Sequence, residues 1–360
     1  LKGAKFHDGK PVTAADVKAN FDRILSPPKG STIPFAALYH ALGKVETPDD
    51  YTVKMSLKYP QAAFLDMVAL PYMVMFPKHI LDAKGDMKKD MVGSGPFKFK
   101  EYVRGVSVEV VRNPDYFVSG RPYLDGIKTY VITDTAAMFS ALRTGQVLMA
   151  GVSQLEVGPA ELEILKKEVP GIVTQVRAVP LLPSFVPNVK RKPWDDVRVR
   201  RAVSLAADRQ GALKVLAQGL GEMGSYNMPG LWGIPKEELL KLPGFRQAKD
   251  ADLAEAKRLL AEAGYPKGFK VTIKPRQVKA MVDIAIYMKN ELAKLGIEAA
   301  VEPVEAGAHK VLLLKGDFEA TAFRDGSPGW DPDVIFGEYF VTGAGKNYGQ
   351  WSDPKVDELF

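Results

Sequence analysis

The sequence contains no cysteine, and only 4 of its 360 residues are histidine. Without cysteine there is no disulfide, no thiolate nucleophile and no cysteine-ligated zinc. The absence of thiols fits an oxidising compartment, where stray thiols are a liability. No two histidines have the i, i+4 spacing of a helical metal site; they are His7, His40, His79 and His309. The sequence therefore predicts neither a metal site nor a cofactor.

A membrane-spanning segment is also missing from the sequence. The longest apolar stretch, around 64–76, is broken by Asp66 and Pro71. It falls short of the about 18 apolar residues that a span needs. The chain begins at Leu1 without an initiator Met or a signal sequence, and it ends at Phe360 inside an expected helix. Both ends read as cut through structure, so the cellular location is not read directly from this sequence.

Positive charge is not gathered into one block, although the net charge is +6. The densest basic stretches are 190–192 and 198–201, and Asp195 and Asp196 lie between them. A nucleic-acid footprint needs basic side chains concentrated on one face. We therefore expect a solvated helix face here and no nucleic-acid partner.

The length predicts two or three structural units. In the N-terminal part, Thr13 and Asp16 have the spacing of a capping box, which predicts a helix that ends before Ser26. Alternating apolar residues predict a hairpin over 44–57 and two strands over 97–112. Further expected elements are a strand over 127–132, helices beginning at 134 and 159, and a strand over 172–179.

The pattern changes after residues 180–193, which contain four prolines and read as an extended crossing between domains. Beyond it, strands are expected over 269–273, 297–302 and 318–323, with helices over 278–295 and 306–315 between them. This β-α-β-α-β order predicts an α/β domain with parallel strand pairing.

Motifs of known catalytic chemistry are absent. There is no Gly-x-Ser-x-Gly elbow, no P-loop and no His-Glu-x-x-His. A Gly-x-Gly-x-x-Gly at 219–224 follows a helix instead of a strand, so we interpret it as a loop. Asp325, Asp331 and Asp333 do not fit a calcium loop. They are either helix-capping and turn-forming groups or ligand contacts, and we expect no enzyme.

A series of short segments carries a family resemblance along nearly the whole chain. They are Lys5 to Val17, Gly93 to Phe97, Asn113 to Phe117, Pro122 to Asp125, Val197 to Ala202 with Ala206 to Arg209, Ala256 to Leu260 with Ala263 to Tyr265, Asp331 to Asp333, and Asn347-Tyr348. In this order the set resembles the family 5 extracellular solute-binding proteins, which serve dipeptide, oligopeptide, nickel and opine importers.

The resemblance implies an α/β fold, the two-lobed clam-shell of periplasmic binding proteins (type II, cluster C-like), with an extra subdomain on lobe I. The implied boundaries are 1–112 for the extra subdomain, 113–182 for part of the lobe I core, and 183–360 for lobe II, the ligand-binding α/β domain. Family members begin with further residues and a signal or lipoprotein sequence, and they end with a segment that returns to lobe I. The resemblance thus implies that N- and C-terminal parts of lobe I are missing from this chain.

The implied function is that of the substrate-binding component of an ABC importer. It would capture a small solute, such as a peptide, an opine or another carboxylate-bearing compound, between two lobes and deliver it to a membrane permease. The expected partners are the solute and the ABC permease subunits, the expected state is a monomer, and the expected location is periplasmic or lipid-anchored outside the cell. The alternative is a solute receptor or chaperone on the same fold, or a nickel- or haem-binding member.

The resemblance also implies a first site residue. Peptide-type members anchor a ligand carboxylate with an arginine between a strand and the long helix of the second lobe, and Arg276 stands close to that position. A guanidinium suits the role because it pairs bidentately with a carboxylate. The alternative for Arg276 is a solvated loop arginine.

A second part of the site departs from the family pattern. Peptide binders hold the ligand ammonium with an Asp in a Trp-x-x-Asp-x-x-Asp-Pro string, and here the segment 323–332 is longer by two residues. Asp325 takes this role if the insertion follows it; otherwise Pro328 stands there and offers no carboxylate. Trp330 and Trp232 are candidates to stack on a flat ligand or else ordinary packing residues, and Arg324 is a candidate to favour an anionic ligand.

Overall fold

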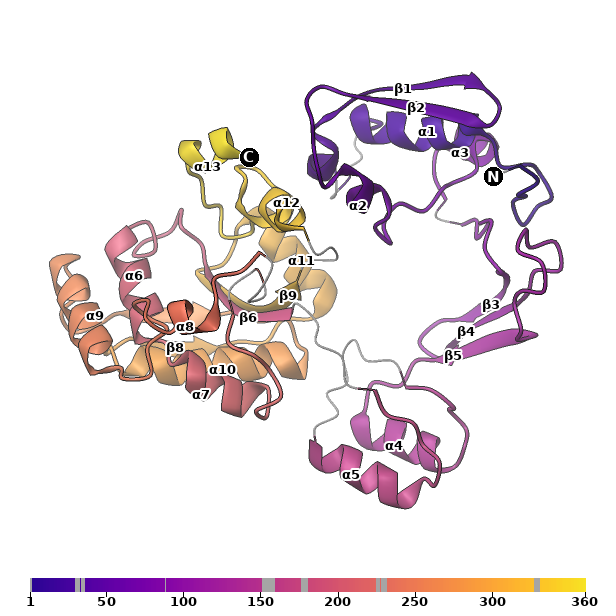
Figure 1. Cartoon of the computed structure of the whole chain (residues 1–360). Coiled ribbons are helices and arrows are strands. Elements are labelled where there is room, and N and C mark those ends of the chain that lie inside the picture. Colours follow the sequence, from indigo (N-terminus) through magenta and orange to yellow (C-terminus); the bar gives the residue numbers. More distant parts are fainter. Residues whose placement is uncertain are drawn as a thin grey trace. The chain divides into compact units, whose positions relative to one another are not determined.

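The computed structural model describes residues 2–29, 33, 36–87, 89–150, 159–175, 181–224, 227, 232–326 and 331–360. The chain divides into two compact units, Leu1–Ala141 and Leu142–Phe360 (Figure 1). We refer to them as unit 1 and unit 2 and describe each by itself. The lobe and subdomain boundaries expected after residues 112 and 182 stay predictions.

Unit 1 contains short helices and two small antiparallel sheets (Figure 1). Its helices are α1 (Ala14–Leu25), the 3-10 turn η1 (Ala36–Tyr39), α2 (Phe64–Val68), α3 (Lys78–Lys84) and α4 (Thr135–Arg143), which runs into unit 2. Its strands are β1 (Leu42–Asp49) and β2 (Thr52–Leu57), which form a hairpin, and β3 (Phe97–Val103), β4 (Ser107–Arg112) and β5 (Gly126–Tyr130), which form a sheet in that order. The helix predicted from Thr13 and the predicted strand pairs are confirmed.

The start of α1 is fixed by the predicted capping box. The Asp16 carboxylate accepts hydrogen bonds from the backbone N–H of Thr13 at 2.8 Å and from its hydroxyl at 2.9 Å. It also accepts one from the backbone N–H of Lys78 at 2.8 Å. Asp16 thereby joins the N-termini of α1 and α3, and its burial is compensated because its oxygens are hydrogen-bonded.

Asn20, one turn further along α1, gives a prediction for the stability of unit 1. Its side chain is buried and exchanges two hydrogen bonds with the backbone of Phe76, at 2.8 and 3.1 Å. Asn20→Ala is expected to lower the free energy of unfolding by about 2 kcal/mol, because two backbone groups lose their partner. Urea unfolding measures this. Lys18→Ala, which removes an exposed pair with Asp22 on the same helix, should change it by less than about 0.5 kcal/mol. Equal effects of the two substitutions would contradict this account.

Unit 2 is built on a four-stranded sheet in the order β6-β9-β7-β8 (Figure 1). The strands are β6 (Leu181–Pro187), β7 (Lys270–Ile273), β8 (Glu298–Val301) and β9 (Ala320–Gly326). β7 pairs in parallel with β8 and β9, as the β-α-β-α-β order predicts, whereas β6 pairs antiparallel to β9. The helices are α5 (Pro159–Glu168), α6 (Val197–Ala206), α7 (Arg209–Leu216), α8 (Lys236–Leu239), α9 (Asp250–Glu262), α10 (Lys279–Ala293), α11 (Ala306–Lys315), α12 (Pro332–Ile335) with the π-helical turn η2 (Phe336–Phe340), and α13 (Pro354–Leu359).

Two expectations about the middle of the chain are corrected. No strand forms over 172–175, and the rest of the predicted strand, 176–179, lies outside the described residues. The proline-rich segment expected to be an extended crossing is instead partly a sheet strand, β6. β6 lies at the edge of the sheet, where Pro183 and Pro187 are tolerated because an edge strand needs fewer N–H donors.

The core of unit 2 forms where helices cover this sheet. Trp194 is fully buried, and its ring meets the rings of Phe185 and Phe269 edge-on at 5.6 and 5.5 Å. α6 packs against α9, and α10 packs against the strands. The chain leaves α10 through Gly296, which has a positive φ of 75° and lies against Gly268; a Cβ at Gly268 would stand 2.1 Å from the Gly296 carbonyl oxygen. This close approach leaves no room for a side chain at Gly268.

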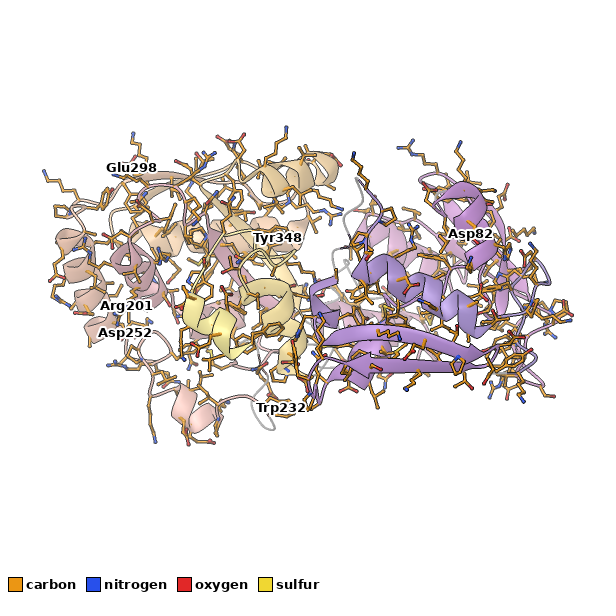
Figure 2. The ribbon with its side chains drawn as sticks, turned by 90° about the horizontal axis from the view of Figure 1, so that it is seen from above. Asp82, Arg201, Trp232, Asp252, Glu298 and Tyr348 are labelled. Atoms are coloured by element: carbon orange, nitrogen blue, oxygen red, sulfur yellow. The ribbon has the colours of Figure 1, made fainter. Side chains whose placement is uncertain are left out.

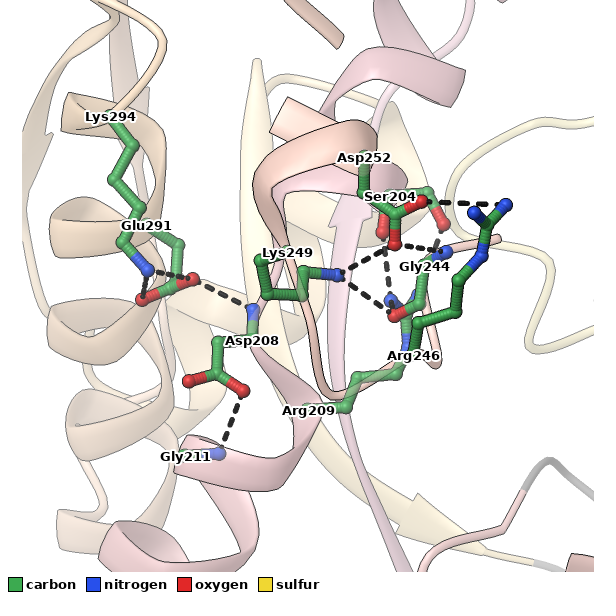
Figure 3. A network of polar contacts seen from close by, with 10 residues as sticks. All are labelled: Ser204, Asp208, Arg209, Gly211, Gly244, Arg246, Lys249, Asp252, Glu291 and Lys294. Carbon is green, nitrogen blue, oxygen red and sulfur yellow. Dashed lines mark hydrogen bonds and ion pairs between the residues drawn. The ribbon is translucent and has the colours of Figure 1, made fainter. Parts of the chain in front are cut away.

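A polar network joins the helices on this core (Figure 3). Asp252 at the start of α9 is 2% exposed and accepts from the backbone N–H of Gly244 at 2.9 Å and from Lys249 Nζ at 3.3 Å. Arg209 donates to the carbonyl oxygens of Ser204 and Gly244 at 2.7 and 2.8 Å. The network therefore ties the turn between α6 and α7 to the loop before α9.

Candidate functional site

The parallel strands of unit 2 end at a common edge, which we call the carboxyl edge. In α/β sheets, ligands bind outside the carboxyl ends of the parallel strands. Arg276 lies there, three residues after β7, and forms a parallel bridge with Val304, which follows β8. Val304 N–H donates to Pro275 O at 2.9 Å, and Gln277 N–H donates to Val304 O at 2.8 Å. The ladder between β7 and β8 thus continues past the strands and holds the backbone of Arg276.

The side chain of Arg276 is half-buried, and its Nε is fully buried. Among the described residues, none accepts a hydrogen bond from this Nε. A buried donor without an acceptor costs about 1–3 kcal/mol, more when it belongs to a charged group. The residue as a whole is partly exposed at the strand end, and a carboxylate is the acceptor that a guanidinium binds most strongly.

A buried polar cluster lies beside this segment, formed by His309 of α11, Thr321 of β9 and the carbonyl group of Lys274. His309 is 3% exposed and Thr321 is 0% exposed. His309 Nε2 lies 3.1 Å from Lys274 O and 3.1 Å from Thr321 Oγ1, and Thr321 Oγ1 donates to Lys274 O at 2.8 Å. The cluster joins the end of β7 to α11 and β9 just before Arg276.

Burial lowers the pKa of His309 below its ordinary value of 6.5, and the positive charge of Arg276 lowers it further. The unfolded chain therefore takes up a proton at a higher pH than the folded one. The stabilisation from the neutral imidazole is complete above pH 6.5 and is lost as the pH falls from there through the folded-state pKa.

This shift predicts a pH-dependent stability. The free energy of unfolding of the wild type should fall between pH 7.5 and pH 5, and His309→Gln should fall less over the same range, because glutamine does not titrate. Urea unfolding at the two pH values measures both. An identical decrease in the two proteins would show that His309 does not contribute the expected proton uptake.

Aromatic rings extend the cluster toward the C-terminal segment. The ring of His309 lies 5.6 Å from that of Phe323 on β9, and Phe323 stacks on Tyr348 at 5.3 Å with an interplanar angle of 15°. The C-terminal segment is held in turn by a buried ion pair in which Lys346 Nζ lies 2.8 Å from a Glu338 oxygen. Aromatic walls of this kind are typical of small-molecule sites.

The other predicted site residues are placed as follows. Arg324 and Asp325 lie on β9, where their backbones pair with Pro183 and Leu182 of β6. β9 neighbours β7 in parallel, and the backbones of Arg324 and Asp325 lie beyond Ala320, the residue of β9 that pairs with the end of β7. Trp330 lies outside the described residues. Trp232 is 54% exposed and lies well apart from Tyr348 (Figure 2), so the structure does not bring it together with the rings beside β9.

Asp331 and Asp333, which the sequence left open between capping and ligand contact, are placed at the start of α12. Asp331 is the N-cap residue, and its side chain accepts from the backbone N–H of Asp333 at 3.0 Å. The capping interpretation is therefore confirmed for Asp331.

The sequence pattern gave no sign that His309, Thr321 and Phe323 meet beside the end of β7. His309 stands in the first turns of a predicted helix, and the other two lie on a predicted strand. The predicted β-α-β-α-β order puts this strand in the same sheet as the strand before Arg276, but it does not say which strands are adjacent. Within the described ranges, no group of three or more His, Asp or Glu side chains is arranged to hold a metal ion. In the same ranges, no helix has both the length and the apolar character needed to cross a bilayer.

Comparison with known proteins places this geometry in a family. Residues 2–347 match the model of the bacterial extracellular solute-binding proteins, family 5 (middle part). The oligopeptide-binding protein AppA of Bacillus subtilis (strain 168) is 31% identical over 392 aligned residues, which cover 99% of this chain and 67% of that protein.

Solved structures agree with the sequence match. The binding protein AgaA of A. tumefaciens R10, in complex with agropinic acid, is 29% identical with a TM-score of 0.77, covering 100% of this chain and 72% of that one. Bacillus subtilis AppA, in complex with a nonapeptide, is 29% identical with a TM-score of 0.78, covering 100% and 73%. These neighbours confirm the predicted fold class, the α/β two-lobed clam-shell of periplasmic binding proteins. The match over nearly the whole chain confirms the resemblance seen in the sequence, and the chain belongs to family 5 of the bacterial extracellular solute-binding proteins.

Proposed function

We propose that this chain captures a small solute bearing a carboxylate and that Arg276 receives this carboxylate. The observation that carries the proposal is the position of Arg276 at the carboxyl edge, with its Nε buried and without an acceptor among the described residues. A bidentate carboxylate would satisfy the guanidinium and neutralise its charge.

The surroundings of Arg276 support an anionic ligand group. α10 begins three residues later at Lys279, and among the described residues no side chain caps its N-terminus. The first N–H groups of a helix carry a partial positive charge. Arg324 lies on the neighbouring strand β9, and we propose that its guanidinium favours a ligand with more than one acidic group.

The relatives support the same ligand chemistry. AgaA was solved with agropinic acid and AppA with a nonapeptide. An organic acid and a peptide with a free C-terminus share a carboxylate but differ in almost everything else. Both ligands are therefore compatible with the carboxylate proposed for the solute of this chain.

The remaining contacts are proposed from the sequence. Asp325 is proposed to hold a ligand ammonium if the ligand has one, and Trp330 and Trp232 are proposed to stack on a flat part of it. We further propose that the protein releases the solute unchanged to the permease subunits of an ABC importer, works as a monomer, and resides in the periplasm or on a lipid anchor outside the cell.

Isothermal titration calorimetry against peptides, opines, organic acids and uncharged sugars tests the proposal. Binding is expected for at least one carboxylate-bearing class, with affinity lost when the carboxylate is replaced by a carboxamide. Tight binding confined to uncharged sugars would contradict the carboxylate part of the proposal and leave solute capture itself standing.

A further inference from the structure

The cluster of His309, Thr321 and the Lys274 carbonyl contains a buried imidazole that solute capture does not use directly. Thr321 Oγ1 donates to Lys274 O at 2.8 Å. A carbonyl oxygen only accepts, so the nitrogen that lies 3.1 Å from it, His309 Nε2, must carry the proton and donate. The neutral tautomer is thus set by the contacts, and both lone pairs of the Lys274 carbonyl are engaged.

The donation to Lys274 O has a consequence for the residues that follow. Lys274 N–H donates to Ala320 O at 2.9 Å, and Pro275 O accepts from Val304 N–H at 2.9 Å. Pro275 is buried and its φ is restricted by its ring. The backbone from Lys274 to Arg276 is therefore held by β9 and α11 on one side and by the segment after β8 on the other.

The positive charge of Arg276 affects the pKa of His309, so the two side chains interact electrostatically. Burial lowers the pKa of His309, the hydrogen bond to Lys274 O opposes this shift, and the charge of Arg276 adds to it. Near neutral pH the imidazole is therefore uncharged. It holds the backbone by a hydrogen bond and not by its charge.

We propose that His309 is a positioning residue for Arg276. By donating to the carbonyl of Lys274 it fixes the segment that presents the guanidinium, so that Arg276 meets a carboxylate in one prepared orientation. Thr321 acts on the same carbonyl from β9. This inference rests on the proposed role of Arg276 and extends it, because it assigns the preparation of that residue to a side chain on another helix. Preparing a contact in advance raises affinity by reducing the entropy lost on binding.

Nuclear magnetic resonance of the whole chain tests the inference, with sodium acetate as the probe and acetamide as its neutral counterpart. The Arg276 Nε–H signal is followed in the wild type, His309→Leu, His309→Gln and Thr321→Val. Glutamine is the matched control because its amide N–H takes the place of the imidazole Nε2–H, whereas leucine fills similar volume without a donor. The Thr321 variant keeps the test decisive if the leucine variant does not fold.

Acetate should shift the wild-type Arg276 signal in a saturable way, and acetamide should not. His309→Leu and Thr321→Val should broaden the signal in the free protein and weaken acetate binding by about tenfold, while His309→Gln stays within about twofold of the wild type. If acetate leaves the wild-type signal unmoved, the proposed carboxylate role of Arg276 is wrong. If acetate binds but folded His309→Leu or Thr321→Val matches the wild type in signal and affinity, the positioning role alone is wrong.

Discussion

Arg276→Ala is expected to weaken binding of a carboxylate-bearing solute by about 100-fold, or about 2.7 kcal/mol. The guanidinium is half-buried and its Nε is buried, so a bound carboxylate would be shielded from water when it pairs with Arg276. Removing one partner of such a pair leaves the other without its hydrogen bonds. Arg276→Lys should recover only part of the affinity, because an ammonium group does not reproduce the bidentate geometry.

Titration calorimetry measures this effect with two matched compounds, a carboxylate-bearing solute and its carboxamide. The Arg276→Ala protein should bind the acid and the amide with similar affinity, whereas the wild type should prefer the acid. Arg258→Ala is the control, since Arg258 is an exposed residue of α9 paired with Glu255 and Glu262. Its solute affinity should equal that of the wild type. If the Arg276→Ala protein still prefers the acid to the same extent, another residue must bind the carboxylate.

Asp252→Ala is expected to lower the free energy of unfolding by about 3–5 kcal/mol, since it removes the anion of a buried charged network. Burial lowers the pKa values of Arg209 and Lys249, and the charge of Asp252 opposes both shifts. Without Asp252, these two cations lose their buried counter-charge and Gly244 N–H loses its acceptor. Arg246, 3.7 Å away, is the third cation affected.

Urea unfolding measures the Asp252 effect. Asp252→Asn should fall between the wild type and Asp252→Ala, because the amide oxygen still accepts from Gly244 but carries no charge. Glu255→Ala, on the same helix, is the matched control; it breaks an exposed pair and should cost less than about 1 kcal/mol. A loss below about 1 kcal/mol for Asp252→Ala would mean that the network in Figure 3 does not tie the helices together.

Much of the fold of unit 2 was predictable because its signals are local. The helix expected over 306–315 is α11 as observed, and the order of strands and helices gave the parallel pairing of β7 with its neighbours. β6 was harder, because its prolines resemble a linker and become compatible with a strand only at a sheet edge. The strand expected over 172–179 failed over 172–175 because alternation alone does not supply a neighbouring strand to pair with.

The site was predictable only in part. The resemblance pointed to Arg276 from its position between a strand and a long helix, and the structure puts it at the carboxyl edge. His309 gave no such signal, because its role depends on a carbonyl 35 residues away along the chain. Tyr348 belonged to a recognised segment, but its stacking on Phe323 depends on how the C-terminal residues return to β9. Contacts between distant segments are what the pattern of a single sequence does not contain.

Carboxylate capture by Arg276 is tested most simply by the identity of the solute that the protein carries when it is isolated from its own cells. Native mass spectrometry gives the mass of the bound compound, and acid release followed by fragmentation gives its functional groups. We expect a small compound with at least one carboxylate, bound by the wild type and absent from Arg276→Ala prepared in parallel. A bound compound without any acidic group, retained equally by both proteins, would contradict carboxylate capture by Arg276.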